Sequence, residues 1–338
     1  MPFLSDNALE KLRNVDVAPD FSGTRYSFSR FIASGGMGAV YLAEDKILFR
    51  RVAIKVLDAA DPDGQLAGRL QQEARILAQL EHPGIVPVHD AGLLPGDRVF
   101  YAMKFVEGAR LDQFLSGALS VSERLRLFLR ICDAVAFAHS RGILHRDLKP
   151  ANIMVGAFGE VLVMDWGLAK VLPRPSGEKL ETVSGAGIAA APATADIAHL
   201  ARKTQDGLIA GTPGFMSPEQ AAGNSSDLDQ RSDIFSLGKL LLFVVRSSNP
   251  NDSGGTRLAR PLLAICEKAA AQDRALRYPT VSALADDVSR YLDGASVSAH
   301  RENVAERLLR FYRRYQPAIL LIAAYLLMRA LFVVYSRR

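Results

Sequence analysis

The N-terminal third of the chain alternates between apolar and polar residues in the way that β-strands do. Three short runs rich in β-branched and aromatic residues cover 28–32, 40–43 and 52–56, and glycines fill the turn between the first two. A period of two residues places every second side chain on one face of a strand. The pattern predicts a hairpin with a glycine-rich tip at 35–38, followed by a third strand.

Helical periodicity begins after these strands. Leu66, Leu70, Leu77 and Leu80 are spaced by four, seven and three residues, which is the spacing of one helix face. Glu73 falls on the same stripe, so the apolar face of the predicted helix carries one carboxylate. An unpaired buried charge is costly, so Glu73 either has a cationic partner or lies at a wet edge of the helix.

Later segments continue with short strands and then long helices. Residues 86–89 and 99–105 have strand character, with a turn at 94–97 between them. A long apolar helix is predicted to have Ser122 as its N-cap and to end before Gly142. This order predicts an α+β protein in which a small β-rich part precedes a larger helical part.

The densest group of chemically capable residues covers 145–152 and 165–167. Asp147 can accept a proton from a hydroxyl nucleophile, and Lys149 can neutralise a phosphoryl group in transfer. Asn152 and the aspartate of the second stretch offer oxygen ligands suited to Mg²⁺. The simpler interpretation is a solvated charged loop between apolar strands, but the order of the residues favours a catalytic loop.

That order, His-Arg-Asp-Leu-x-x-x-Asn followed by Asp-Trp-Gly, resembles the eukaryotic-like protein kinases. The phrases Gly-Gly-Met-Gly-Ala-Val-Tyr, Leu-Lys-Pro-Ala-Asn and Met-Ser-Pro-Glu-Gln are similar to those of the bacterial, Hanks-type serine/threonine kinases. The resemblance covers about four-fifths of the chain, from 26 to 292. It implies a two-lobed protein kinase fold with a lead-in over 1–25, a β-rich N-lobe over 26–106 and a helical C-lobe over 107–296.

The resemblance also implies an ATP site between the lobes. Lys55 is expected to hold phosphates and to pair with Glu73, Met103 to stand at the gatekeeper position, and 104–106 to form the hinge. The residues implied for catalysis are Lys55, Glu73, Asp147 and Lys149, those for Mg²⁺, or Mn²⁺ in its place, are Asn152 and Asp165, and those for ATP are Ile32, Ala33, Ser34, Gly35, Gly36, Met37, Gly38, Val40, Ala53, Lys55, Met103, Val106 and Met154.

The glycine turn departs from the family at one position. Gly35 and Gly38 match the second and third glycines of the kinase phosphate loop, and Ala33 stands at the first. A dinucleotide-binding turn is the competing interpretation, but that turn must open a helix. Residues 39–42 are β-prone, so the kinase loop is favoured.

Other positions match residues that the family uses to support its catalytic loop. Asp233 matches the aspartate that holds this loop by its backbone, and Arg277 matches the partner of Glu219. Surface salt bridges are the alternative for both. His139 is expected to be a packed core histidine, and the indole N–H of Trp166, which replaces the usual phenylalanine, needs an acceptor.

Two segments differ from the family in length. Residues 173–206 are predicted to be an insertion in the activation segment, rich in small and polar residues. In this family a cation at the position of Arg146 commonly pairs with a phosphorylated residue, so autophosphorylation is expected. The segment after Arg246 is shorter than usual, which puts the docking of protein substrates in doubt. The candidate phosphorylation sites are Thr204 first, then Thr182, Ser184 and Thr194.

Composition and charge limit the kinds of molecule that the chain is expected to bind. The chain has 338 residues, 49% of them hydrophobic, and a formal net charge of +5. Eight arginines and two glutamates follow residue 299, so their +6 leaves about −1 for the rest, and a nucleic-acid surface has no support. Cys132 and Cys266 are expected to be buried thiols, as in a reducing compartment. No cleavable signal peptide is expected.

The C-terminus is predicted to anchor the protein in a membrane. Residues 297–316 form a basic juxtamembrane segment, and 317–335 form an apolar helix that contains Arg329, which could snorkel towards the interface. More arginines precede this helix than follow it, which predicts a single-pass inner-membrane protein with a cytoplasmic kinase domain. The alternative is an amphipathic helix that packs on the large lobe or lies on the membrane surface.

The predicted function is transfer of the ATP γ-phosphate to serine and threonine hydroxyls of proteins, including the chain itself, for which it would form a homodimer. A second hypothesis is an ATP-binding pseudokinase that serves as a membrane scaffold, motivated by Ala33 and the short segment after Arg246. A third is a kinase for small molecules, although the sequence announces no pocket for them. Against the second stands the retention of Lys55, Glu73, Asp147, Asn152 and Asp165.

Overall fold

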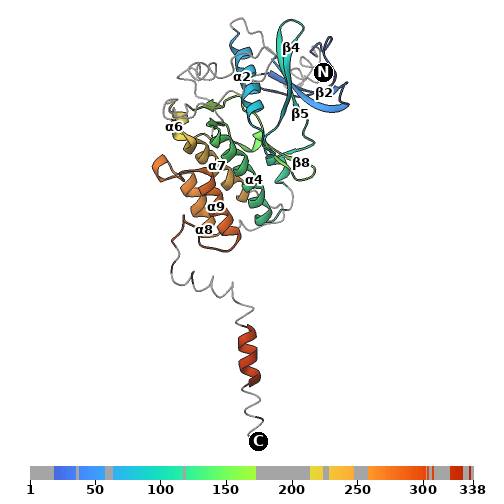
Figure 1. The fold of residues 1–338 in the computed structure, drawn as a ribbon. Helices are drawn as coiled ribbons and strands as arrows, with labels where there is room; N and C mark the ends of the chain where they lie inside the picture. Colours follow the sequence, from blue (N-terminus) through green and yellow to red (C-terminus); the bar gives the residue numbers. More distant parts are fainter. Residues whose placement is uncertain are drawn as a thin grey trace, which may run out of the picture.

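The computed structural model describes residues 19–35, 38–57, 64–116, 119–172, 214–223, 228–246, 258–301, 303, 307, 320–329 and 335. Figure 1 shows a β-rich lobe at the top of the view and a helical lobe beneath it. The predicted two-lobed α+β architecture is confirmed.

The small lobe is built on one antiparallel sheet with the strand order β1-β2-β3-β5-β4. The strand predicted at 86–89 is present, but its bounds differ, because pairing begins only at Val88 and continues to Leu94. Pro87 has no N–H for the ladder, although its carbonyl accepts a hydrogen bond from Lys104 N at 3.1 Å. The strands are β1 Tyr26–Gly35, β2 Gly38–Asp45, β3 Arg50–Val56, β4 Val88–Leu94 and β5 Arg98–Lys104.

Helix α2, Gln65–Gln79, packs against β4 and β5. Its buried side chains include Leu70 and Leu77 of the predicted stripe. Glu73 is buried on the same face with 1% of its surface exposed. The helix therefore turns its single buried carboxylate towards the sheet that carries Lys55, and the wet-edge alternative is wrong.

A three-stranded sheet, β6-β8-β9, forms the floor beneath the first sheet. The first residue of β6 is glycine because the strand approaches β8 closely there. A Cβ on Gly108 would lie 2.0 Å from the carbonyl oxygen of Val155. The elements of this region are β6 Gly108–Arg110, the short helix α3 Leu111–Phe114, β8 Ile153–Gly156 and β9 Val161–Val163, with β7 Ile143–Leu144 paired to β10 Lys170–Val171 nearby.

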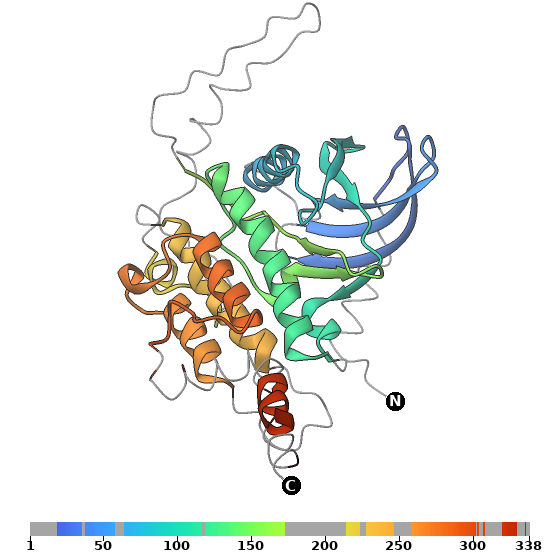
Figure 2. The ribbon, with the colours of Figure 1, turned by 60° about the horizontal axis from the view of Figure 1, so that its bottom comes forward.

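The large lobe is a set of packed helices around α4, Val121–Ser140 (Figure 2). Helix α4 contacts α7, Gln230–Arg246, and α9, Val281–Leu292, while α7 contacts α8, Arg260–Ala269. Shorter elements complete the lobe: α6 Pro218–Ala221 and the 3₁₀ helices Pro150–Asn152 and Arg274–Leu276.

The N-cap of α4 is Ser120, so the prediction of Ser122 is wrong. The Ser120 hydroxyl accepts a hydrogen bond from Glu123 N, and the Glu123 carboxylate accepts one from Ser120 N at 2.8 Å. This reciprocal capping box satisfies two backbone donors at once. Ser122 has no glutamate or glutamine three residues later and lies within the first turn.

The main hydrophobic core runs through both lobes, and a second cluster lies on the other face of the small-lobe sheet. Phe21 belongs to this second cluster, so the end of the predicted lead-in packs on the sheet. Cys132 and Cys266 are free and buried. Burial raises the pKa of both thiols, which keeps them protonated and unreactive.

The chain beyond α9 is held to the large lobe by Asp287. This carboxylate accepts hydrogen bonds from Ser298 N at 2.7 Å, Ala299 N at 3.0 Å and the Tyr278 hydroxyl at 2.8 Å. Residues 320–329 are helical, and their large apolar side chains are exposed. Within the described parts of the chain, no helix is both long enough and apolar enough to cross a membrane.

Candidate active site

Lys55 on β3 and Glu73 on α2 form a buried ion pair. The Lys55 ammonium lies 2.8 Å from both carboxylate oxygens of Glu73, and the Tyr101 hydroxyl donates to Glu73 Oε1 at 2.9 Å. Burial alone would lower the pKa of Lys55, but the carboxylates of Glu73 and Asp165 outweigh it and raise the pKa. Lys55 therefore stays a cation at the end of the cavity between the lobes.

Asp165 faces Lys55 from the other lobe, at 3.3 Å between Nζ and Oδ1. Burial alone would raise the pKa of Asp165, but Lys55 and His145 lower it, so the group is a carboxylate at neutral pH. Asp165 has a φ of 57° and Arg146 a φ of 70°, a region that non-glycine residues rarely adopt. Strain of this kind persists only where the surroundings enforce it.

Asp147 lies in the catalytic loop with its carboxylate held on two sides. Lys149 Nζ lies 2.7 Å from Asp147 Oδ2, and Asn152 Nδ2 donates to the same oxygen at 2.9 Å. Asn152 Nδ2 also donates to the Asp147 carbonyl at 2.9 Å. Because Nδ2 makes these two bonds, Oδ1 of Asn152 is the atom available to a metal ion.

Asp233 on α7 holds the backbone of the catalytic loop by hydrogen bonds. Its carboxylate accepts hydrogen bonds from the N–H groups of His145 and Arg146, both at 2.8 Å, and it is fully buried. His139 Nε2 lies 2.7 Å from Asp233 Oδ2. Burial alone would raise the pKa of Asp233, but His139 and the loop amides lower it. The backbone contact predicted for Asp233 is confirmed, and His139, whose side chain is 6% exposed, supports it.

Trp166 lies behind the catalytic loop with its side chain fully buried. Its indole ring packs on His145 with ring centres 4.5 Å apart. The Trp166 N–H donates to the Val163 carbonyl at 3.3 Å, which supplies the expected acceptor. The larger aromatic ring therefore fits in place of phenylalanine without an unsatisfied polar group.

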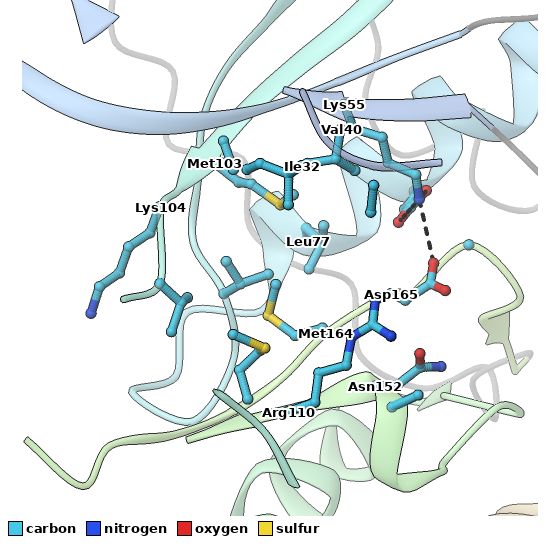
Figure 3. Close-up of a pocket in the computed structure, with 18 of the residues that line it drawn as sticks. Ile32, Val40, Lys55, Leu77, Met103, Lys104, Arg110, Asn152, Met164 and Asp165 are labelled. Atoms are coloured by element: carbon cyan, nitrogen blue, oxygen red, sulfur yellow. Dashed lines mark hydrogen bonds and ion pairs between the residues drawn. The ribbon is translucent and has the colours of Figure 1, made fainter. Parts of the chain in front are cut away.

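A cavity of about 520 Å³ opens between the two lobes (Figure 3). Figure 3 shows Ile32 and Met103 on one side of the cavity and Lys55 with Asp165 on the other, and the lining also includes Ala53, Val106 and Met154. Of the residues expected to contact ATP, those that line this cavity are Ile32, Ala33, Ser34, Gly38, Val40, Ala53, Lys55, Met103, Val106 and Met154, joined by Glu73, Asp147, Asn152 and Asp165.

The glycine turn keeps its hairpin geometry despite Ala33. Ala33 pairs with Val40 in the ladder, and Gly35 pairs with Gly38 at the end of it. Gly38 has a φ of 140°, and a Cβ there would lie 2.2 Å from the carbonyl oxygen of Val56. This glycine is thus required by the close approach of β3. Gly36 and Met37 lie outside the described residues.

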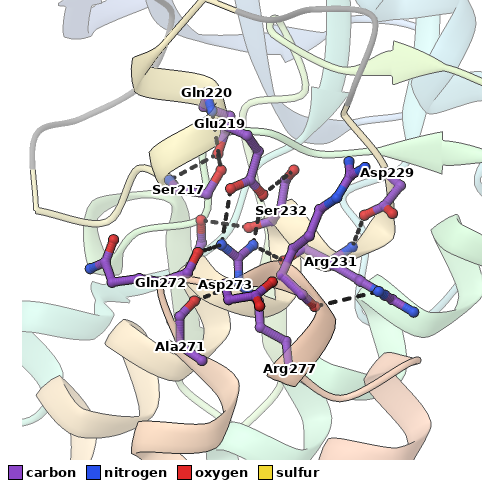
Figure 4. Close-up of polar contacts among 12 residues, drawn as sticks. Ser217, Glu219, Gln220, Asp229, Arg231, Ser232, Ala271, Gln272, Asp273 and Arg277 are labelled. Carbon is purple, nitrogen blue, oxygen red and sulfur yellow. Dashed lines mark hydrogen bonds and ion pairs between the residues drawn. The ribbon is translucent and has the colours of Figure 1, made fainter.

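An ion pair between Glu219 and Arg277 attaches the segment after the activation segment to the large lobe (Figure 4). Arg277 donates from Nη1 to Oε1 at 2.6 Å and from Nη2 to Oε2 at 2.9 Å, and Ser232 donates to Oε1 at 2.8 Å. Although burial alone would raise it, these bonds lower the pKa of Glu219 to about 2. The Arg277 side chain is fully buried, so the predicted pair is confirmed and is not a surface salt bridge.

Gln220 connects this segment to the catalytic loop. Its side-chain amide donates to the Arg146 carbonyl at 2.8 Å, and it accepts a hydrogen bond from Ser217 N at 3.2 Å. The segment 217–221 therefore contacts both the C-lobe helices and the strained residue beside Asp147.

Several residues of the site were not found from the sequence. Tyr101 bonds to Glu73, and Arg110 and Gln113 line the cavity from the floor. Tyr101 is one of a strand of apolar residues, and nothing in its spacing marks a polar role. Arg110 would have been found if β6 had been predicted to pair with β8. A strand of three residues is too short to show an alternating pattern, so the sequence does not reveal it.

The donor set fits a magnesium ion held jointly with a nucleotide. Mg²⁺ usually binds one or two carboxylates and completes its shell with water and phosphate oxygens. Asp165 and Asn152 offer such oxygens at the polar end of the cavity. In the described ranges no group of three or more histidine, cysteine, aspartate or glutamate residues could hold a metal alone.

A family model for the protein kinase domain matches residues 26–296. The chain therefore belongs to the protein kinase family, as the fold and the site residues above indicate.

The relatives narrow the branch. The chain is 32% identical over 335 residues to the "Serine/threonine-protein kinase PknD" of Protochlamydia amoebophila, covering 87% of this chain and 32% of that protein. It is 35% identical over 304 residues to the protein of that name in Chlamydia felis, covering 80% and 31%. The relatives are named serine/threonine kinases, and the chain spans about a third of their length.

Solved kinase domains share the fold. The crystal structure of the Mycobacterium tuberculosis PknI kinase domain matches with a TM-score of 0.54 and 25% identity, covering 80% of this chain and 96% of that one. A second PknI structure matches with a TM-score of 0.55 over 81% and 99%.

Proposed function

We propose that the chain is an active, ATP-dependent kinase that phosphorylates serine and threonine residues of proteins. The observation that carries the proposal is the assembled set of charges around one cavity. Lys55 pairs with Glu73, Asp165 faces Lys55 at 3.3 Å, and Asp147 and Asn152 line the same cavity. Family membership supplies the rest of the argument.

Each residue has a separate task in this proposal. Lys55 binds the α- and β-phosphates, and Asp165 and Asn152 hold Mg²⁺, which neutralises charge on the phosphates when bound. Asp147 orients the acceptor hydroxyl and takes its proton, while Lys149 balances the charge that moves to the transferred group. Because the transition state of phosphoryl transfer is loose, position and charge account for most of the catalysis.

Phosphotransfer from labelled ATP by the full chain tests this function. Lys55→Met should remove transfer to a generic protein substrate, because the phosphates lose their cation. The two other hypotheses predict different results. A pseudokinase would transfer no phosphate even as the wild type, and a small-molecule kinase would transfer phosphate only to small molecules. Equal transfer by the wild type and Lys55→Met would contradict the proposed function.

Autophosphorylation of the insertion at 173–206 is part of the proposal. Thr204 is the first candidate, followed by Thr182, Ser184 and Thr194, and all four lie outside the described residues. The support comes from Arg146, whose Nε is buried without a hydrogen-bond partner. Burial lowers the pKa of Arg146, and a phosphate nearby would offset that cost.

Mass spectrometry of the active chain tests this part. Phosphate on Thr204, with a rate that rises with protein concentration, is expected if two copies phosphorylate each other as a homodimer. An absence of phosphate between Val171 and Thr212 would contradict it.

Anchoring in the inner membrane through 317–335 is the last part of the proposal, with the kinase domain in the cytoplasm. The described residues of this segment, 320–329 and 335, are helical, and Leu321 and Met328 expose 73% and 69% of their surfaces. An apolar helix exposed in this way needs an apolar environment. Release of the chain from membranes by carbonate would contradict a spanning anchor, and deletion of 317–338 should abolish membrane association.

A further inference from the structure

Arg110 enters the nucleotide cavity from the floor. It is the last residue of β6 and pairs in register with Met154 of β8. Directly opposed residues of antiparallel strands place their side chains on the same face of the sheet. Since Met154 lines the cavity, Arg110 does so too. The close approach of β6 to β8 at Gly108 fixes this arrangement.

The guanidinium of Arg110 has no partner within the described parts of the chain. No hydrogen bond or ion pair joins it to any described residue, whereas Lys55 pairs with Glu73 and Asp165, and Lys149 pairs with Asp147. A guanidinium carries five N–H donors in a planar fork that matches carboxylate and phosphate oxygens. Arg110 is exposed and lines the cavity, so its N–H donors are accessible to an anion bound there.

The direction of the side chain indicates which part of the nucleotide it meets. Figure 3 shows Arg110 extending from the floor towards Asp165 and Asn152, across the cavity from Lys55. The apolar end of the cavity, beside Met103, suits the adenine ring, so the phosphates lie towards the charged end. Arg110 and Lys55 thus approach the same stretch from opposite walls.

We propose that Arg110 binds the phosphate chain of the nucleotide from the C-lobe wall, as a second cation opposite Lys55. The proposal rests on the proposed ATP-dependent function and adds a residue to it. Two cations on opposite walls would hold the phosphates from both sides. The chain should therefore bind ATP and ADP more tightly than adenosine, by a larger factor than Lys55 alone provides. Contact with the ribose or with an acidic residue of the protein substrate would give different results in the test below.

The test compares the affinities of adenosine, ADP and ATP for the full chain by calorimetry in the presence of Mg²⁺. Arg110→Gln should weaken ADP and ATP binding about 10- to 100-fold, which is the range for a charge-assisted hydrogen bond, and should leave adenosine binding unchanged. Arg110→Lys should recover part of the loss. Arg126→Gln is the matched control, because Arg126 is an exposed arginine of the same lobe that does not line the cavity.

Several results would overturn the inference. Equal ATP affinity in the wild type and Arg110→Gln would exclude a phosphate contact. An equal loss for adenosine and ATP would indicate a ribose contact, and a change confined to the KM of the protein substrate would indicate a substrate contact. A wild-type chain that binds no ATP would overturn the proposed function itself, which separates that failure from the failure of the inference.

Discussion

Replacing Glu219 by glutamine should destabilise the C-lobe by about 2 to 3 kcal/mol at neutral pH. The pKa of Glu219 falls from 4.5 to about 2 in the folded protein. At about 1.4 kcal/mol for each pH unit, this difference corresponds to about 3 kcal/mol, which solvent screening of the partly exposed carboxylate reduces to about 2. Loss of the charge also leaves the fully buried Arg277 without its counter-ion, which adds to the cost.

The pH dependence of the stability difference is a second test of this prediction. Because the folded pKa of Glu219 lies below the unfolded one, its contribution is fully present above about pH 4.5 and is lost as the pH falls towards about 2. The difference in stability between the wild type and Glu219→Gln should therefore be constant from pH 6 to pH 8, roughly, and should shrink in acid.

Urea denaturation followed by tryptophan fluorescence measures the effect. Trp166 is the single tryptophan and is fully buried beside the catalytic loop, so its emission reports the folded C-lobe. Glu107→Gln is the control: Glu107 pairs with Arg51, both side chains are more than half exposed, and the expected change is below about 1 kcal/mol. Equal losses in the two variants, or a loss for Glu219→Gln that does not change in acid, would refute the reasoning.

Two other carboxylates give sharp predictions. Asp233→Asn should lower phosphotransfer at least about tenfold, because an amide accepts poorly from both the His145 and Arg146 N–H groups, and should shift Trp166 emission as the loop moves; unchanged activity and emission would contradict the proposed role. Asp287→Asn should cost roughly 2 to 3 kcal/mol by weakening the attachment of the chain after α9, whereas the exposed neighbour in Asp286→Asn should cost close to nothing, and thermal melts compare the two.

The sequence predicted the elements whose pattern is long or whose chemistry is unusual. The helix stripe marked Glu73 as a charge in need of a partner, and the kinase resemblance supplied Lys55 as that partner. The kinase resemblance then located Asp147, Asp165 and Asp233 from their order in the chain. These residues share one property: each belongs to a short motif of fixed order and spacing, which can be recognised without knowledge of the fold.

The failures have local causes. Ser120 and Ser122 are both acceptable N-caps by residue type, and only the glutamate three residues after Ser120 separates them. Val86 looks like a strand residue, but the following proline delays the ladder. Arg110 joins the site through a three-residue strand that pairs with one more than forty positions later in the chain, and such a contact leaves no periodic signal in the sequence.

The most direct test of the central claim measures ATP binding and phosphotransfer together in Asp147→Asn. The Asp147 carboxylate lies 2.7 Å from Lys149 Nζ and lines the cavity, whereas the proposed function assigns nucleotide binding to Lys55 and the metal ligands. The variant should bind ATP with an affinity within about threefold of the wild type and should transfer phosphate at least about a thousandfold more slowly. Transfer at the wild-type rate by Asp147→Asn would contradict the assignment of this carboxylate and the catalytic function built on it.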